Sequence, residues 1–275
     1  MIRDRLVVIL ILLPVGIGVA LAGGFSLACV VVLVILLAAM EYAKLFSRPD
    51  LQIPAWLVGG GASVLALLRW FFGFDHIGFA VTAILIVTAI WFVIQYERGQ
   101  ARAATAMGMT IGGTIYLGWL IAFFISLRQL PYGLWWTLIV VTCICGADSF
   151  AFLIGRRWGR HPLAPHLSPK KTWEGYFGGI LGGVVGGLLI GWLLGIPAGP
   201  LSGISPWTGL ILAIPISILA PVGDLAISMM KREMARKDTG TLLPGHGGAL
   251  DRIDSWLIAA AIGYYMILAV VPMVR

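Results

Sequence analysis

The chain has 275 residues, of which 60% are hydrophobic and only 11% are charged. Soluble domains usually carry about 25% charged residues, so this composition excludes an ordinary soluble protein and favours one whose solvent is lipid. The net charge of +7 would suit nucleic-acid binding in a soluble protein, but the positions of the charges indicate membrane orientation and no nucleic-acid partner.

Charged and turn residues divide the chain into nine apolar segments, each of a length that can cross a bilayer as a helix. The expected fold is therefore an all-α polytopic membrane protein. The first segment has some features of a signal peptide, but another span follows at once, so we expect it to be retained. The nine expected spans are Leu6–Ala22, Phe25–Phe46, Leu51–Leu68, Ile77–Tyr96, Ala103–Leu127, Leu130–Ile154, Gly175–Gly195, Trp207–Ile227 and Ser255–Val274.

The lysine and arginine residues predict the orientation of these spans. Sixteen of the 19 fall in segments that face the cytoplasm if the N-terminus lies inside, and an odd number of spans then places the C-terminus outside. A short chain without a transit peptide favours a bacterial inner membrane. The three cysteines, Cys29, Cys143 and Cys145, lie in apolar runs and are expected to be unpaired.

Two cytoplasmic loops, 155–174 and 228–254, hold dense clusters of basic residues. We therefore divide the chain into a scaffold of helices, residues 1–130, and a catalytic region, residues 131–275. Between the loops, glycines recur every four residues from Gly175 to Gly195 and form a bare stripe on one helix face. Helix packing is the favoured use of this stripe, and a homodimer contact is the alternative.

Asp148 and Asp224 lie inside apolar segments, where a carboxylate costs several kcal/mol and is a functional candidate by default. Both are close to the cytoplasmic ends of their spans. An ion-coupled transporter would place such acids nearer the midplane, so a boundary site fits better a reaction between a lipid head group and a water-soluble partner.

The first basic loop contains Ser168, Lys170 and Lys171 just before an expected helix that Thr172 caps. Glu174 in the first turn complements the helix dipole. Two lysines at a helix N-terminus oppose that dipole, which favours an anion bound between them. Binding to anionic lipid head groups is the rival explanation.

The second basic loop begins on a helix whose exposed face presents Asp224, Ser228, Lys231 and Arg232 at helical spacing. Glycines further along would let the backbone turn closely around phosphate, with His246 between them as a further contact. Several carboxylates among basic residues predict a Mg²⁺ and polyphosphate site. The glycines and carboxylates concerned are Gly245, Gly247, Gly248, Asp251 and Asp254.

These residues resemble the signature of the phosphatidate cytidylyltransferase family. The matching positions are Ser228-x-x-Lys231-Arg232, Lys237-Asp238-x-Gly240, Leu243-Pro244-x-His246-Gly247-Gly248 and Asp251-Arg252-Ile253-Asp254. The stretch Ser168 to Gly175 and Asp148 are also similar to the family. Ala249 departs from it, since a larger apolar residue is usual there, which is a change of packing.

The resemblance implies transfer of CMP from CTP to phosphatidic acid, giving CDP-diacylglycerol and pyrophosphate, at a site on the cytoplasmic side among membrane lipids. It implies Asp224, Asp251, Lys231 and Arg232 as catalytic residues, and Asp148 and Asp254 as metal ligands beside the first two. Substrate-binding residues would be Ser168, Lys170, Lys171, Ser228, Lys237, His246, Gly247, Gly248 and Arg252. The alternatives are a CTP-dependent enzyme for another lipid (polyprenyl or archaeal-type), an ion-coupled transporter, and a structural protein that binds anionic lipids.

Overall fold

A computed structural model of the chain describes residues 18, 21–240 and 247–272. The chain is a mostly helical polytopic membrane protein. Within the described residues, eight helical stretches are long and apolar enough to cross a membrane, and they correspond to the last eight expected spans. The first expected span lies almost entirely outside the described residues. The helices are α2 (Gly24–Phe46), α3 (Ala55–Phe72), α4 (Ile77–Glu97), α5 (Ala103–Ile121), α6 (Phe123–Gln129), α7 (Gly133–Trp158), α8 (Trp173–Ala198), α9 (Pro206–Glu233) and α10 (Leu250–Val270).

Lipid exposure explains both the helical structure and the apolar surface. A backbone that crosses hydrocarbon must satisfy its polar groups internally, which an α-helix does. On α4, large apolar side chains such as Phe79, Ile90 and Val93 are more than half exposed. Such a surface would promote aggregation in water, whereas it suits contact with lipid tails.

Several helix ends differ from the expected ones. Helix α3 begins at Ala55 because Pro54 takes the N-cap position, and α9 continues through Glu233 into the charged sequence. Helix α10 begins at Leu250, five residues before the expected start at Ser255. Asp251 and Asp254 therefore both lie on this helix, three residues apart. Ser228, Lys231 and Arg232 all lie on α9.

The first basic loop contains a two-stranded antiparallel hairpin, β1 (Pro162–Ala164) and β2 (Ser168–Thr172), which the all-α expectation did not include. Thr172 caps α8 as expected, its Oγ1 accepting a hydrogen bond from the Gly175 N–H at 3.2 Å. Glu174 accepts hydrogen bonds from the backbone N–H groups of Arg160 and His161 at 3.1 and 3.3 Å. The hairpin is thus fixed to the start of α8.

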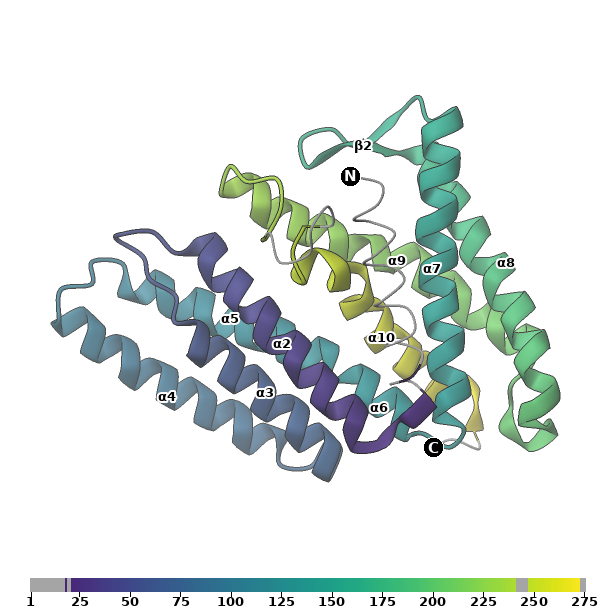
Figure 1. Ribbon diagram of the computed structural model, residues 1–275, viewed down its shortest axis with the longest axis horizontal. Coiled ribbons are helices and arrows are strands. Elements are labelled where there is room, and N and C mark those ends of the chain that lie inside the picture. The colour runs from purple at the N-terminus through teal and green to yellow at the C-terminus, as the bar shows by residue number, and fades with distance from the viewer. Residues whose placement is uncertain (1–17, 19–20, 241–246, 273–275) are drawn as a thin grey trace. The chain divides into compact units, whose positions relative to one another are not determined.

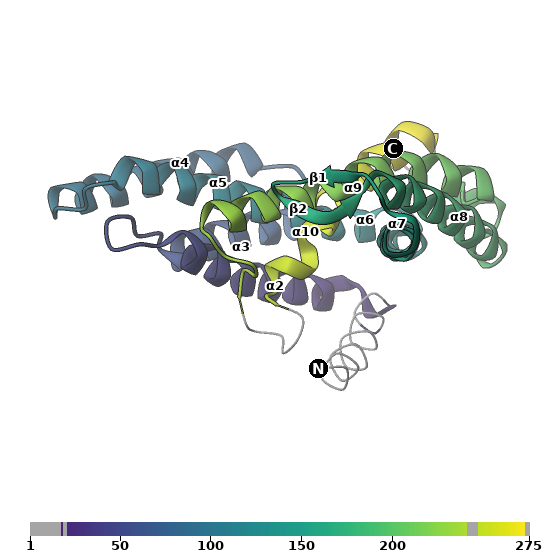
Figure 2. The same cartoon turned by 90° about the horizontal axis from the view of Figure 1, so that it is seen from above.

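The chain forms two compact units. The first comprises residues 1–126 and 233–253, and the second comprises residues 127–232 and 254–275. The functional division of the chain at residue 130 stays a prediction, because packing does not test it. In the first unit α3 packs against α2 and α5, and α4 packs against α3 and α5 (Figures 1 and 2). The Tyr42 hydroxyl donates to the Met109 carbonyl at 2.9 Å and joins α2 to α5.

In the second unit, α7 and α8 form an extensively packed helix pair (Figure 1). The glycine stripe of α8 makes this possible: a Cβ atom at Gly179 would lie 2.9 Å from the Ala147 carbonyl oxygen, and one at Gly187 would lie 2.5 Å from the Gly209 oxygen of α9. The stripe therefore packs against α7 and α9 of its own chain, as the favoured interpretation predicted. All three cysteines are unpaired, as expected.

Candidate active site

Three carboxylates of the second unit, Asp148 on α7, Asp224 on α9 and Asp254 on α10, form what we call the carboxylate cluster. The negative charge of Asp224 repels those of Asp148 and Asp254, and the positive charge of Lys171 on β2 offsets this repulsion at both positions. The Lys171 ammonium lies 2.5 Å from Asp224 Oδ2. With all groups ionised, the cluster carries two more negative than positive charges, and such a group attracts a further cation.

Close helix packing brings these acids together. Gly223 packs so tightly on α10 that a Cβ atom there would collide with the Asp254 carbonyl oxygen. The absence of a side chain lets α9 approach α10, and the next residue, Asp224, consequently lies beside Asp254. On α7, Asp148 directly follows Ala147, whose carbonyl faces Gly179 of α8. The small residues at these crossings thus position the acids.

Strand β2 separates the two lysines that sequence reasoning treated as a pair. Side chains alternate along a strand, so neighbouring residues point to opposite faces. Lys171 is half-buried and pairs with Asp224, whereas Lys170 is exposed. Ser228, one turn after Asp224, donates its hydroxyl to Asp224 Oδ1 at 3.3 Å. The structure therefore places Lys171 and Ser228 at the cluster.

The remaining basic residues of α9 extend from the same helix. Lys231 is buried, with 9% of its surface exposed. The Arg232 guanidinium donates through Nε to the Leu167 carbonyl oxygen at 3.1 Å, which connects α9 to the hairpin just before Ser168. An arginine holding a loop in this way gives that loop a defined position while part of its guanidinium stays exposed.

The loop after α9, described at residues 234–240 and 247–249, belongs to the first unit, and we call these residues the signature loop. Asp251 organises it: its Oδ2 accepts hydrogen bonds from Thr239 N and Oγ1, both at 2.9 Å, and from Gly248 N at 3.0 Å. Gly247 has φ +78°, a backbone conformation that glycine adopts without strain. The Gly248 N–H thus has a partner within the protein.

Two further predicted residues of the first unit, Lys237 and Arg252, are exposed. Their ammonium and guanidinium groups are therefore accessible to water-soluble phosphates. His246 lies outside the described residues.

Sequence reasoning missed one acid, Glu41 on α2. It is 7% exposed, and its carboxylate accepts hydrogen bonds from Thr239, Ala249 and Leu250. Its proximity to Lys44 made it resemble an ordinary charge at the end of a span. The available signal was that Glu41 has apolar residues on both sides, Met40 and Tyr42, and therefore lies inside the span.

The fit of the site to a metal ion follows from its donor set. Across the residues that the structure describes, no group of three or more Asp, Glu, His or Cys side chains has the spacing of a complete protein-only metal site. Mg²⁺ does not need one, because it is commonly held by one or two carboxylates together with substrate phosphates and water. The all-oxygen carboxylate cluster fits that mode of binding.

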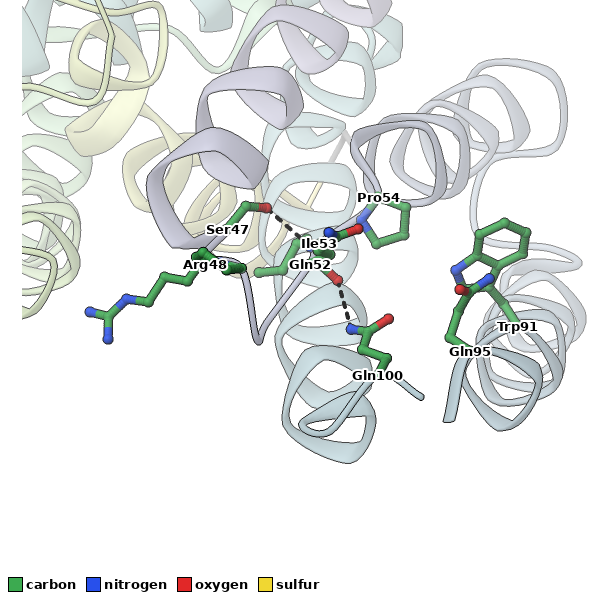
Figure 3. Close-up of a pocket in the computed structure, with 9 residues that line it drawn as sticks. Ser47, Arg48, Gln52, Ile53, Pro54, Trp91, Gln95 and Gln100 are labelled. Atoms are coloured by element: carbon green, nitrogen blue, oxygen red, sulfur yellow. Dashed lines mark hydrogen bonds between the residues drawn. The ribbon is translucent and has the colours of Figure 1, made fainter. Parts of the chain in front are cut away.

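A pocket of about 430 Å³ with a mixed polar and apolar lining lies in the first unit, near the ends of α2 and α4 (Figure 3). Its walls are tied together by two hydrogen bonds, from Ile53 N to Ser47 Oγ at 3.1 Å and from Gln100 Nε2 to the Gln52 carbonyl oxygen at 3.3 Å. The Arg48 side chain points away from it in Figure 3. None of the predicted site residues is among those that line this pocket, which are Ser47, Arg48, Pro49, Gln52, Ile53, Pro54, Trp91, Gln95 and Gln100.

The helices pack through buried glycines and carry acids beside a basic hairpin. This arrangement defines the class of membrane proteins with a polar site among packed helices. The family follows from comparison: residues 3–270 match the model of the cytidylyltransferase family, and the chain belongs to that family.

Curated relatives cover most of the chain. It is 33% identical to phosphatidate cytidylyltransferase 5, chloroplastic, of Arabidopsis thaliana, over 92% of this chain and 68% of the relative. It is 29% identical to phosphatidate cytidylyltransferase of Mycobacterium bovis, over 88% of this chain and 80% of the relative. It is 33% identical to phosphatidate cytidylyltransferase of Brucella abortus, over 76% of this chain and 70% of the relative.

Proposed function

We propose that this protein transfers CMP from CTP to phosphatidic acid and releases pyrophosphate. A phosphate oxygen of phosphatidic acid forms a bond to the α-phosphorus of CTP, the bond from that phosphorus to the bridging oxygen of the β-phosphate breaks, and the product is CDP-diacylglycerol. The observation that carries the proposal is the carboxylate cluster beside Lys171, in a chain whose family relatives are named phosphatidate cytidylyltransferases. These relatives favour this reaction over a transporter and over a different lipid acceptor.

The chemistry asks for positioning and charge neutralisation more than for covalent catalysis. The nucleophile is already an anionic phosphate oxygen, so no general base is required. Lys171, Lys231 and Arg232 come from the hairpin and α9 and would neutralise the triphosphate as negative charge shifts to the leaving pyrophosphate. The exposed side chains Lys170, Lys237 and Arg252 would guide anionic substrates to the site.

Asp148, Asp224 and Asp254 are the residues that would hold Mg²⁺. When bound, this ion neutralises phosphate charge and orients the triphosphate. Asp251 as a further ligand rests on sequence alone. In our proposal Asp224 has a second task, holding the Lys171 ammonium in place, and Ser228 orients the Asp224 carboxylate.

We further propose that the chain crosses a bacterial inner membrane nine times, with its N-terminus and both basic loops in the cytoplasm and its C-terminus outside. The distribution of positive charge supports this orientation. CTP is water-soluble and cytoplasmic in such a cell, so the orientation also supplies the substrate. Homodimer formation stays a prediction, which the mass of the purified protein in detergent would test.

The deciding experiment incubates purified protein with labelled CTP and a panel of lipids, with Mg²⁺ and with EDTA. We expect labelled CDP-diacylglycerol from phosphatidic acid and a loss of at least about a hundredfold in EDTA, since a catalytic metal contributes several kcal/mol. Adding back Mg²⁺ should restore turnover. Product from a polyprenol or from an archaeal-type lipid, but none from phosphatidic acid, would show that the acceptor has been misassigned.

A further inference from the structure

Glu41 is a buried acid whose partners explain why it can be buried. A carboxylate removed from water in an apolar helix costs several kcal/mol unless donors surround it. Glu41 Oε2 accepts from Thr239 Oγ1 at 3.0 Å and from Leu250 N at 2.9 Å, and Oε1 accepts from Ala249 N at 2.8 Å. The donors therefore come from both sides of residues 241–246 in the sequence.

The two backbone donors lie at the start of α10. The first N–H groups of a helix have no partner within the helix, and negative charge there is favourable. Glu41 supplies that charge from α2, some 200 residues away in the chain. It thus fixes the position where α10 begins, immediately before Asp251.

Glycines provide the space for this carboxylate. A Cβ atom at Gly240 would lie 2.6 Å from Glu41 Oε1, and one at Gly248 would collide with Oε2 and with the Thr239 hydroxyl. Both glycines belong to the signature loop. Their role in the described structure is to let the loop close around the Glu41 side chain.

Thr239 connects the two acids that hold the loop. Its Oγ1 lies 3.0 Å from Glu41 Oε2 and 2.9 Å from Asp251 Oδ2, so the single hydroxyl proton is shared between two carboxylate acceptors. Glu41 and Asp251 are therefore linked through one side chain.

We propose that Glu41 is a positioning residue for the signature loop: it sets the start of α10 and the orientation of Asp251 without contacting substrate. This inference rests on the proposed function only for its activity measurement. It adds α2 to the elements that determine the geometry of the signature loop, although α2 lies outside the signature sequence.

The test compares Glu41→Gln with Glu97→Gln, a matched change at an exposed acid on α4. Glutamine keeps the size but turns an NH₂ group toward backbone or hydroxyl donors. We expect kcat to fall about 10- to 100-fold, the range seen when groups that orient metal ligands are removed, with the KM for each substrate changing less than kcat. Glu97→Gln should leave both unchanged.

Hydrogen exchange gives a measurement that does not depend on turnover. In Glu41→Gln, the amides of residues 247–253 should exchange at least about tenfold faster, because the contacts of Ala249 and Leu250 are lost. Thr239→Val should also speed exchange at these amides. The kcat of the double variant should fall much less than the product of the two single-variant decreases. Should Glu41→Gln not fold, Thr239→Val carries the test.

Unchanged exchange at residues 247–253 in both variants would overturn the inference, whatever the activity. So would fully additive effects on kcat. If the wild-type protein makes no CDP-diacylglycerol but these amides still respond to Glu41→Gln, the proposed function fails and the positioning role stands.

Discussion

The two units use carboxylates in opposite ways. In the first, Glu41 and Asp251 face hydrogen-bond donors, three of which lie within hydrogen-bonding distance of one oxygen of Asp251, and they hold the signature loop. In the second, Asp148, Asp224 and Asp254 are close enough to repel one another, with Lys171 as the opposing charge. Acids surrounded by donors stabilise a fold, whereas acids that repel one another stabilise it only when a cation is added. From this comparison we expect the first set to stabilise the fold and the second set to bind a cation.

Replacing Asp224 with asparagine should have the largest effect on turnover. The substitution keeps the size, removes one charge from the carboxylate cluster and weakens the ion pair with Lys171. Loss of one preorganised charged group at a reacting phosphate costs about 10²- to 10³-fold in kcat. The rate of CDP-diacylglycerol formation measures it, and a monodisperse elution profile in detergent controls for folding. Near-normal kcat would break the assignment of this cluster to the reaction.

Asp251→Ala and Asp224→Ala should differ in how much stability the protein loses, because the two acids have different partners. Asp251→Ala leaves the Thr239 and Gly248 N–H groups without their acceptor, at about 1–3 kcal/mol for each donor left unsatisfied. Asp224→Ala removes an ion pair but also removes repulsion from Asp148 and Asp254.

Thermal unfolding in detergent provides the comparison. We expect a clearly lower Tm for Asp251→Ala and a Tm for Asp224→Ala close to that of the wild type. Equal destabilisation by the two substitutions would contradict the division between them.

The two lysines of β2 allow a similar comparison, with smaller expected effects on KM. Lys171→Ala removes the partner of Asp224, so the apparent KM for a phosphate-bearing substrate should rise about tenfold. Lys170→Ala, its neighbour on the opposite face, should raise KM only about twofold through reduced attraction of anions. Titrations of CTP and of phosphatidic acid measure both. An equal effect of the two alanines would indicate that strand alternation does not select between them.

Much of the fold could be predicted from the sequence because apolar runs and charges mark membrane helices directly. The eight described spans lie where they were expected, and Thr172 caps α8. The hairpin could not be predicted, since residues 159–172 show no alternation of apolar and polar side chains. The start of α10 was placed late because the backbone N–H groups of Ala249 and Leu250 donate to Glu41, which is distant in sequence.

The site shows the same limit. Composition and spacing identified the acids and lysines, and a family resemblance gave their chemistry. Which lysine meets which acid depends on β2, and which carboxylate holds the loop depends on α2. Neither pairing leaves a local signal, because each joins residues from elements that the sequence alone does not place side by side. The role of His246 and the metal ligands stay predictions.

The smallest expected effect concerns the packing that positions the carboxylate cluster. Gly187→Ala places a methyl group 2.5 Å from the Gly209 carbonyl oxygen and 2.7 Å from Ala213 Cβ, so helices α8 and α9 must move apart. Gly186→Ala, one residue earlier, meets Thr142 at 3.5 Å, an ordinary contact. Within a helix, alanine is more stable than glycine by about 1 kcal/mol, whereas overpacking a helix contact costs about 1–3 kcal/mol. We therefore expect Gly187→Ala to lower stability by about 1 kcal/mol and Gly186→Ala to leave it equal or raise it, as thermal unfolding would show.

The same helix crossings bring the acids together, so a loss of turnover that accompanies the lower Tm of Gly187→Ala would connect helix packing to the site. An unaffected Tm would refute the close crossing.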